Sequence, residues 1–301
     1  MIKQMTPTLH DALSGRIAAG ERLRPEDIEQ LAATHDILAV GMLADQARRL
    51  LHGTRVTYVR VASWAFDHAP GAVPPAAREV RLTGTPESLD AALAATHAAV
   101  AVADGRVVSG FSLADMVPLA ERAGLALREA LDRLRAAGLN RLAECPLDRV
   151  ATDAIEAVMG AGLDGVRLTV SKAAAAGDRV ALLSRAAELG RRFSAIDTIN
   201  LLPMLLETFR PTTGYEDVKM ISLARLAAPA IPHVQVDWQR YGPKLAQVAL
   251  TFGADDLDNV SPSDEAPDGR RRAALEEVRR NIEAAGFTPA ERDGRFGPAL
   301  R

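Results

Sequence analysis

The sequence predicts an α/β fold, a barrel of eight parallel strands with helices on its outer side. The chain has eight short segments of strand character, and about seven of them alternate with segments of helical periodicity, a pattern typical of βα units in a parallel sheet. The chain has 301 residues and 48% hydrophobic content, which suits one large barrel domain. Residues 232–238 also alternate polar and apolar side chains, which indicates a strand with two unlike faces.

Composition limits the partners and the compartment. The net charge of −3 gives no reason to expect nucleic acid or an anionic membrane surface as a partner. No apolar run approaches the roughly 18 residues of a membrane helix, and the N-terminus lacks a signal-peptide pattern, so we expect a cytoplasmic protein. The single cysteine, Cys145, excludes an intramolecular disulfide and a cysteine-rich metal site. We expect it to be a small buried residue.

Helices precede the first strand. Residues 9–51 are helical by pattern, and Glu26 and Asp27 follow Pro25 in a first turn, where the helix dipole favours acidic side chains. We expect one domain: residues 1–51 form an N-terminal helical cap, residues 56–258 the barrel, and residues 259–301 a C-terminal helical extension.

The remaining elements follow from periodicity and turn residues. The expected strands are residues 56–62, 79–82, 106–111, 140–145, 165–171, 194–201, 231–238 and a last one that begins after Gly253. The expected helices are residues 88–103, 116–122, 126–137, 148–161, 179–190, 215–228, 243–252 and 270–285. Residues 63–78 are short and rich in Pro, Gly and Ala, so we expect a first crossover without a full helix.

Two segments resemble a known family. Residues 242–258 read Gly-x-Lys-Leu-Ala-Gln-Val-Ala-Leu-x-Phe-Gly-Ala-Asp-Asp-Leu-Asp, and residues 285–293 read Ala-Gly-x-x-Pro-x-x-Arg-Asp. Both resemble the C-terminal part of the radical-SAM enzymes of the futalosine route to menaquinone. Those are aminofutalosine synthase and dehypoxanthine futalosine cyclase, with the tyrosine-attaching subunit of deazaflavin (FO) synthase as a cousin. The resemblance runs from about Gly110 onward and implies a (β/α)8 barrel of the radical-SAM type with N-terminal helices.

The N-terminal half departs from that family. The resembling enzymes carry Cys-x3-Cys-x2-Cys after the first strand, and its thiolates hold an iron–sulfur cluster that binds S-adenosylmethionine. Residues 61–66 stand at that place and contain no cysteine, and Cys145 alone cannot replace three thiolates. The family's Gly-Gly pair is reduced to Gly84, which we interpret as a turn glycine. We therefore expect no iron–sulfur cluster, no radical chemistry and no other cofactor, and we leave binding of S-adenosylmethionine open.

Polar residues at strand positions form the candidate ligand site. Barrels bind ligands at the C-terminal ends of their strands, so inward polar side chains there predict a small-molecule pocket in the barrel lumen. The set is Arg81, Glu144, Arg167, Asn200, His233, Gln235, Asp237 and Asp256. Arg81 and Arg167 could supply counter-charge to Asp237 or to an anionic ligand. The alternatives are a satisfied internal network, or a face assignment wrong by one residue, which would turn each set outward.

No metal site and no nucleophile is predicted. His233 and Asp237 are the only histidine and carboxylate on one predicted strand face, and two ligands are too few for a metal ion. The chain shows no nucleophile-elbow signature for Ser/His/Asp catalysis.

Three functions stay open at this point. The first is a paralogue of the futalosine-pathway enzymes without the cluster, associated with menaquinone biosynthesis, that binds a nucleoside-like or chorismate-derived molecule or forms a heteromer with an active relative. The second is a non-radical enzyme that uses Glu144, His233 or Asp237 for acid–base chemistry. The third is a non-catalytic interaction protein. Genome neighbourhood separates the first from the others, and ligand screening separates the second from the third.

Overall fold

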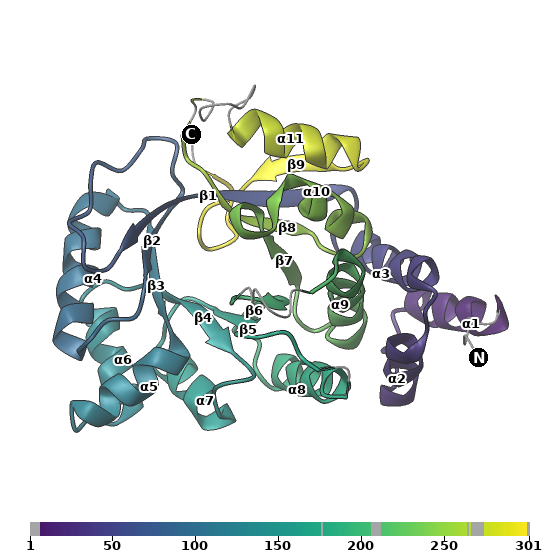
Figure 1. Cartoon of the computed structure of the whole chain (residues 1–301), viewed down its shortest axis with the longest axis horizontal. Coiled ribbons are helices and arrows are strands. Elements are labelled where there is room, and N and C mark those ends of the chain that lie inside the picture. Colours follow the sequence, from purple (N-terminus) through teal and green to yellow (C-terminus); the bar gives the residue numbers. More distant parts are fainter. Residues whose placement is uncertain (1–6, 176, 206–211, 264, 266–273, 300–301) are drawn as a thin grey trace. The chain divides into compact units, whose positions relative to one another are not determined.

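The computed structural model describes residues 7–175, 177–205, 212–263, 265 and 274–299. In this part of the chain the strands pair in the order β2-β3-β4-β5-β6-β7-β8-β1, and β1 also pairs with β2 (Figure 1). Parallel registers join β1 to β2, β2 to β3, β3 to β4 and β6 to β7. The fold is therefore a closed (β/α)8 barrel with helices before its first strand, as the sequence predicts.

The described elements follow the predicted order. The strands are β1 (Arg55–Ala65), β2 (Glu79–Thr83), β3 (Val107–Ser112), β4 (Arg141–Pro146), β5 (Val166–Val170), β6 (Ile196–Pro203), β7 (His233–Asp237), β8 (Asp256–Val260) and β9 (Thr288–Glu291). The helices are α1 (Pro7–Ala18), α2 (Pro25–Ala33), α3 (Ile37–His52), α4 (Leu89–Ala103), α5 (Leu113–Arg122), α6 (Leu127–Ala136), α7 (Thr152–Gly160), α8 (Arg179–Arg192), α9 (Gly214–Ala227), α10 (Trp238–Thr251) and α11 (Ala274–Ala284).

The connection between β1 and β2 is a loop. Residues 66–78 are all described and contain no helix, which confirms the expected shortened crossover. Pro70, Pro74 and Pro75 in this loop lack the amide donors that a continuous helix needs. The last part of β1, Val61–Ala65, still pairs in parallel with β2.

Among the described residues, β9 is the one strand that the sequence did not predict. Thr288 N, at its start, donates to Thr54 O just before β1 over 2.8 Å, and β9 follows β1 at the end of the strand order. β9 has only four residues and contains Pro289, so its periodicity is too short to be read from the sequence.

Some element boundaries differ from the prediction. α7 begins at Thr152, four residues after the predicted start. α10 begins at Trp238, and Gly242 interrupts it with a φ of 75° before Pro243, so the predicted break at this Gly-Pro pair is present inside the element. The predicted terminal helix, residues 270–285, is described only from residue 274 onward.

The chain divides into two compact units. The first comprises Met1–Thr57, Thr169–Leu257 and Arg279–Ala290, and the second comprises Tyr58–Leu168, Asp258–Val278 and Glu291–Arg301. The predicted division into cap, barrel and extension remains a prediction. None of the helices in the described ranges has the length and apolarity that a membrane crossing requires.

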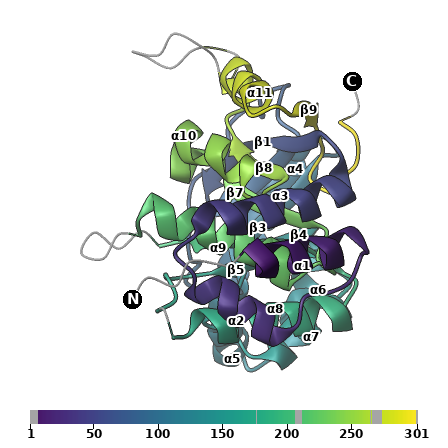
Figure 2. The same cartoon turned by 90° about the vertical axis from the view of Figure 1, so that its right-hand side faces the viewer.

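In the first unit, α2 and α3 pack on the helices that follow β5 and β6, and α1 packs on α3. α3 contacts α1 and α9, and α2 contacts α8 and α9 (Figure 2). Asp36 caps α3 by accepting a hydrogen bond from Ala39 N over 3.1 Å, which satisfies an otherwise unpaired helix amide. Gly41 allows the close approach of α3 to Phe252, because a Cβ there would lie 2.6 Å from the Phe252 ring.

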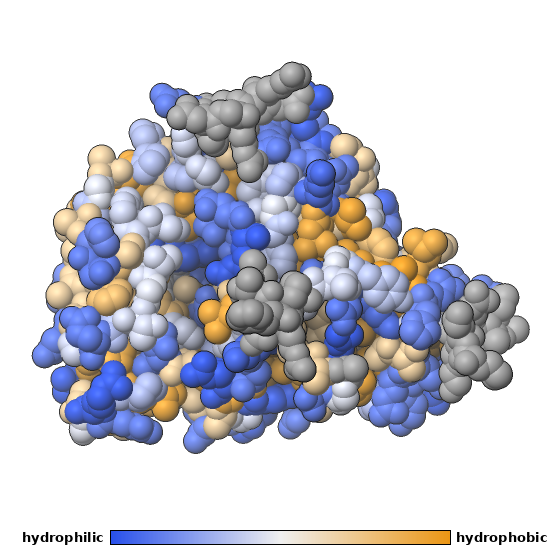
Figure 3. Space-filling model, viewed as in Figure 1, coloured by the Kyte–Doolittle hydropathy of each residue, from blue (hydrophilic) through white to orange (hydrophobic). Residues whose placement is uncertain are grey.

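Large apolar side chains also remain exposed in the first unit. Leu38 and Met42 on α3 are 69% and 63% exposed, and Val248 on α10 is 45% exposed. Figure 3 shows apolar surface on the face of the molecule that carries α10.

In the second unit, helices cover the outer face of β2, β3 and β4. α4 contacts β2 and β3, and α5 contacts β3 and β4 (Figure 1). All residues of β2 except its last are buried, as expected for a parallel strand covered on both faces. Gly110 on β3 keeps the strands close, since a Cβ there would lie 2.8 Å from Leu82 Cβ.

Candidate functional site

A cluster of buried charged side chains lies in the second unit. Arg81 on β2 donates from Nη1 and Nη2 to the two carboxylate oxygens of Asp258 on β8, over 2.8 and 2.9 Å. Arg81 Nη2 also donates to Glu79 Oε1 over 2.6 Å, and Ser109 on β3 donates to the same oxygen over 2.5 Å. Arg167 on β5 donates to Asp258 Oδ2 over 2.8 Å. β2, β5 and β8 are not neighbours in the strand order, so these side chains meet on the inner face of the barrel. We name these five residues the Arg81 cluster.

The charges of the Arg81 cluster balance one another. Burial would raise the pKa of Asp258, but Arg167 and Arg81 outweigh burial and hold that pKa far below its ordinary value. Burial would lower the pKa of Arg81, but Asp258 and Glu79 raise it well above its ordinary value. Burial lowers the pKa of Arg167, although a guanidinium keeps its proton in proteins. Two cations therefore face two anions at neutral pH.

Two buried atoms of the cluster lack a hydrogen-bond partner. Among the described residues, nothing pairs with Glu79 Oε2 or Arg167 Nε. An unpaired buried polar group costs about 1–3 kcal/mol, so a polar group of a water molecule or of a ligand would be stabilised at either atom.

Strained backbone adjoins the cluster. Phe111 on β3 has a φ of 60°, and Asn259 on β8, next to Asp258, has a φ of 59°. A bulky residue such as phenylalanine rarely adopts positive φ, and such strain, about 1–3 kcal/mol per residue, is concentrated at functional sites. Both residues lie in the second unit, beyond the buried charges on their strands.

The counter-charge to the two arginines is Asp258, which the sequence analysis did not select. Arg81 and Arg167 both pair with Asp258, not with Asp237. Asp258 lies two residues after the predicted Asp256 on β8. The period of two along a strand places both on one face, so the signal was present in the sequence.

Two predicted residues of the first unit meet. Gln235 Nε2 donates to Asp256 Oδ2 over 2.6 Å, and Thr57 Oγ1 donates to Asp256 Oδ1 over 2.6 Å. All three side chains are buried. In the described part of the chain Gln235 Oε1 has no hydrogen-bond partner.

Three other predicted residues are placed separately. Asp237 caps α10 by accepting from Arg240 N over 2.9 Å. Asn200 Oδ1 accepts from Leu202 N over 3.1 Å on β6. Glu144 is half-buried on β4. Asp237 and Asn200 therefore fix local backbone, which the sequence analysis did not anticipate.

The eighth predicted residue, His233, belongs to a second cluster at the start of β7. His233 Nδ1 lies 2.6 Å from Asp255 Oδ2, and His52 Nε2, at the end of α3, lies 3.4 Å from the same oxygen. The imidazole rings stack with centroids 5.2 Å apart. Asp255 Oδ1 accepts from Val234 N over 2.8 Å and from Arg225 on α9. We name His52, His233 and Asp255 the histidine cluster.

The surroundings set the ionisation of the histidine cluster. Burial would raise the pKa of Asp255, but Arg225 and the hydrogen bond from His233 lower it to about 2. Burial lowers the pKa of His52 by more than Asp255 raises it. At neutral pH the cluster therefore holds an ionised carboxylate and a neutral His52. Sequence reasoning missed the cluster because His52 lies about 180 residues before the start of β7, although His233 and Asp255 are only 22 residues apart.

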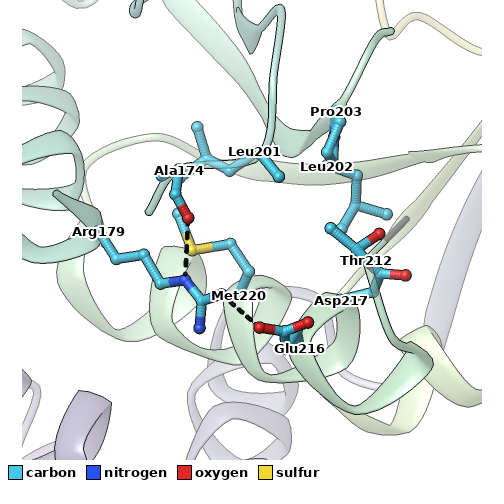
Figure 4. A pocket seen from close by; sticks show the side chains of 10 residues that line it. Ala174, Arg179, Leu201, Leu202, Pro203, Thr212, Glu216, Asp217 and Met220 are labelled. Carbon is cyan, nitrogen blue, oxygen red and sulfur yellow. Dashed lines mark hydrogen bonds and ion pairs between the residues drawn. The ribbon is translucent and has the colours of Figure 1, made fainter. Parts of the chain in front are cut away.

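A small pocket lies beside the end of β6 in the first unit (Figure 4). Arg179 closes one side by donating to Glu216 Oε1 over 2.7 Å and to Ala174 O over 3.3 Å. The volume of the pocket is about 20 Å³, enough for roughly one water molecule. None of the predicted site residues lines it.

The residues at the end of β1 do not fit an iron–sulfur cluster. Val61–Phe66 contains no thiol, and the chain's only cysteine, Cys145, is fully buried at the end of β4. Clusters of this kind are held by cysteine thiolates. Gly84, after β2, has a φ of 89°, which agrees with its interpretation as a turn glycine.

Comparison with known proteins confirms the predicted resemblance. Residues 191–299 match the family described as the CofH/MqnC C-terminal region. The 5-amino-6-(D-ribitylamino)uracil–L-tyrosine 4-hydroxyphenyl transferase of Methanoculleus marisnigri is 25% identical over 322 residues, which covers 85% of this chain and 87% of that protein. The aminodeoxyfutalosine synthase of Streptomyces coelicolor is 36% identical over 90 residues, 28% of this chain and 23% of that protein.

Other transferases of the same name are matched over 24% to 63% of their own length, so for these relatives the chain covers less than two thirds of the protein. Among solved structures, methylornithine synthase has a TM-score of 0.68 at 16% identity and covers 92% of this chain and 97% of its own. That likeness supports the (β/α)8 barrel and, at this identity, nothing beyond the fold.

Proposed function

We propose that this chain is a relative of the futalosine-pathway and ribitylaminouracil–tyrosine enzymes that acts without an iron–sulfur cluster and binds a small polar molecule in its barrel. The observation that carries the proposal is the cysteine-free end of β1, Val61–Phe66, in a chain that keeps the barrel. Without thiolates the chain cannot hold the cluster, so its barrel would serve binding or a different chemistry.

The Arg81 cluster is the proposed binding element. Glu79 Oε2 and Arg167 Nε are buried and lack partners among the described residues, and an acceptor and a donor of a ligand would satisfy them. A nucleoside-like or chorismate-derived molecule offers hydroxyl, amide or carboxylate groups of that kind. Strain at Phe111 and Asn259 is the second observation that favours a functional role there.

A calorimetric and thermal-shift screen tests the proposal. The probes are 5-amino-6-(D-ribitylamino)uracil, L-tyrosine, aminodeoxyfutalosine and S-adenosylmethionine. We expect one of the first three to raise the melting temperature of the wild-type protein. Arg167→Ala should weaken that binding tenfold or more, equivalent to about 1.4 kcal/mol per decade. The variant should remain folded because Asp258 keeps its bidentate partner Arg81.

Arg133→Ala is the matched control. Arg133 is exposed and pairs with Glu129 over 2.8 Å in the same unit, so its removal should leave binding unchanged. If no probe binds, and Arg167→Ala only lowers the melting temperature, the balanced cluster is a structural network and the binding proposal fails. A non-catalytic interaction protein would then be the better description.

Association with menaquinone biosynthesis forms part of the same proposal. It rests on the similarity to aminodeoxyfutalosine synthase and on the family match of residues 191–299. Deletion of the gene in its host should alter the menaquinone content of the cells, and an unchanged content would remove this part of the proposal.

A further inference from the structure

Three potential metal-ligand atoms converge in the histidine cluster of the first unit. They are His52 Nε2, His233 Nδ1 and Asp255 Oδ2, and all lie within 4.8 Å of one another. The residues stand at the end of α3, at the start of β7 and directly before β8. Three structural elements therefore place two imidazole nitrogens and a carboxylate oxygen around one point.

One of the distances between these atoms already matches a tetrahedral site. Ligand atoms about 2.0–2.1 Å from zinc lie roughly 3.3 Å from one another. His52 Nε2 already lies 3.4 Å from Asp255 Oδ2. His233 Nδ1, hydrogen-bonded to that oxygen at 2.6 Å, would move outward by roughly 0.7 Å to reach the same spacing.

We propose that His52, His233 and Asp255 bind a divalent cation of the zinc class, with water as the fourth ligand. Imidazole and carboxylate are ligands that zinc accepts, and three protein ligands leave the open position of a non-structural site. Each histidine side chain is 18% exposed, so an ion can enter from solvent.

Neighbouring groups already orient the carboxylate. Val234 N and Arg225 both bind Asp255 Oδ1, which leaves Oδ2 directed at the imidazoles. Arg225 also donates to Pro232 O over 2.8 Å, and the contact of that carbonyl with His52 Nε2 at 2.9 Å would have to open when an ion binds. Outer hydrogen bonds of this type hold ligands in position around metal ions.

Arg225 also limits the affinity of the site for a cation. Arg225 offsets the charge of Asp255, and the guanidinium of Arg48, on α3, adds positive charge nearby. Binding would therefore depend on the two imidazoles, and each would have to give up any proton on the ring nitrogen that faces the ion. Loss of either imidazole should consequently remove most of the affinity.

Metal-free wild-type protein, prepared with a chelator and then dialysed, provides the first test. Titration with ZnCl2 should show one equivalent bound and a higher melting temperature, because a ligand that binds only the folded state stabilises it. X-ray absorption of the zinc-loaded protein should detect two imidazole ligands at about 2.0–2.1 Å. Absence of stoichiometric zinc, or a spectrum without two imidazoles, would overturn the proposal.

Variants identify the site. His52→Gln and His233→Gln should each weaken zinc binding 100-fold or more. His68→Gln should not, although its Nδ1 also lies 2.8 Å from a carboxylate oxygen, that of Asp67, in an exposed pair. Melting temperatures of the metal-free variants show whether each is folded. Equal affinity in the wild type and in both cluster variants would place the ion elsewhere on the surface and refute the assignment.

Discussion

Arg81 and Asp258 form a bidentate ion pair in the barrel interior, with Nη1 and Nη2 of the guanidinium 2.8 and 2.9 Å from the two carboxylate oxygens. Both side chains are buried. Fork-to-fork pairs of this type are stronger and more directional than single contacts. Because neither group meets bulk water, the stability of the second unit depends on both remaining present.

Removal of one partner of this pair should be strongly destabilising. Arg81→Met leaves Asp258 with only Arg167 and leaves Glu79 without a guanidinium, so we expect a loss of about 3–5 kcal/mol. Urea unfolding followed by circular dichroism measures it. Arg133→Met, at an exposed pair, should change stability by no more than about 0.5 kcal/mol. Equal effects of the two substitutions would contradict the buried pair.

The lowered pKa of Asp255 should make the free energy of unfolding depend on pH. Its pKa is lowered from 3.8 to about 2 in the folded protein. The stability that it contributes is present above the unfolded pKa and is lost as pH falls from about 4 to about 2. The shift corresponds to about 2 kcal/mol.

Urea unfolding at several pH values between about 5 and about 2 measures this contribution. Asp255→Asn should be less stable than the wild type at the upper end, because it leaves Arg225 buried without its anion. Its stability should also fall less steeply between about pH 4 and about pH 2. Parallel curves for the two proteins would show that Asp255 does not titrate as inferred.

Anaerobic reconstitution with iron and sulfide tests the loss of the cluster. We expect no stoichiometric iron or sulfide and no cleavage of S-adenosylmethionine to 5′-deoxyadenosine, because Val61–Phe66 offers no thiolate. Isothermal calorimetry with S-adenosylmethionine, run separately, determines whether the barrel keeps contacts to the nucleoside. A loaded cluster would refute the argument from missing ligands.

The packing of α3 depends on a glycine. Gly41→Ala would place its Cβ 2.6 Å from the ring of Phe252, and the displaced ring should cost about 1–3 kcal/mol. Gly15→Ala is the control, because a Cβ there meets nothing within 4 Å and alanine favours helix by up to about 1 kcal/mol. Thermal unfolding should therefore move in opposite directions for the two variants.

The sequence determined the barrel more completely than the site. Alternation of strand and helix segments predicted eight strands in order. The prolines before β2 predicted that the first crossover contains no full helix. These signals are local. β9 was not predicted, because four residues with an internal proline are too few to show the alternation of a strand.

The site depended on contacts between distant segments. Arg81 and Arg167 were selected from the sequence, but only the folded chain shows that Asp258 neutralises both. His52 ends a helix, and nothing in its local sequence connects it to Asp255. Asp237 was selected as a ligand-binding residue from its strand position, but it also caps the following helix. Periodicity alone cannot distinguish a polar side chain that faces the lumen from one that caps a helix.

The single cysteine of the chain can report its local unfolding without any added label. Cys145 is fully buried, so an alkylating reagent can reach its sulfur only when β4 opens to solvent. A single modification event per molecule, followed by mass spectrometry, would give the opening rate directly. No engineered probe is needed, and a comparison with and without a candidate ligand would show whether binding slows that opening.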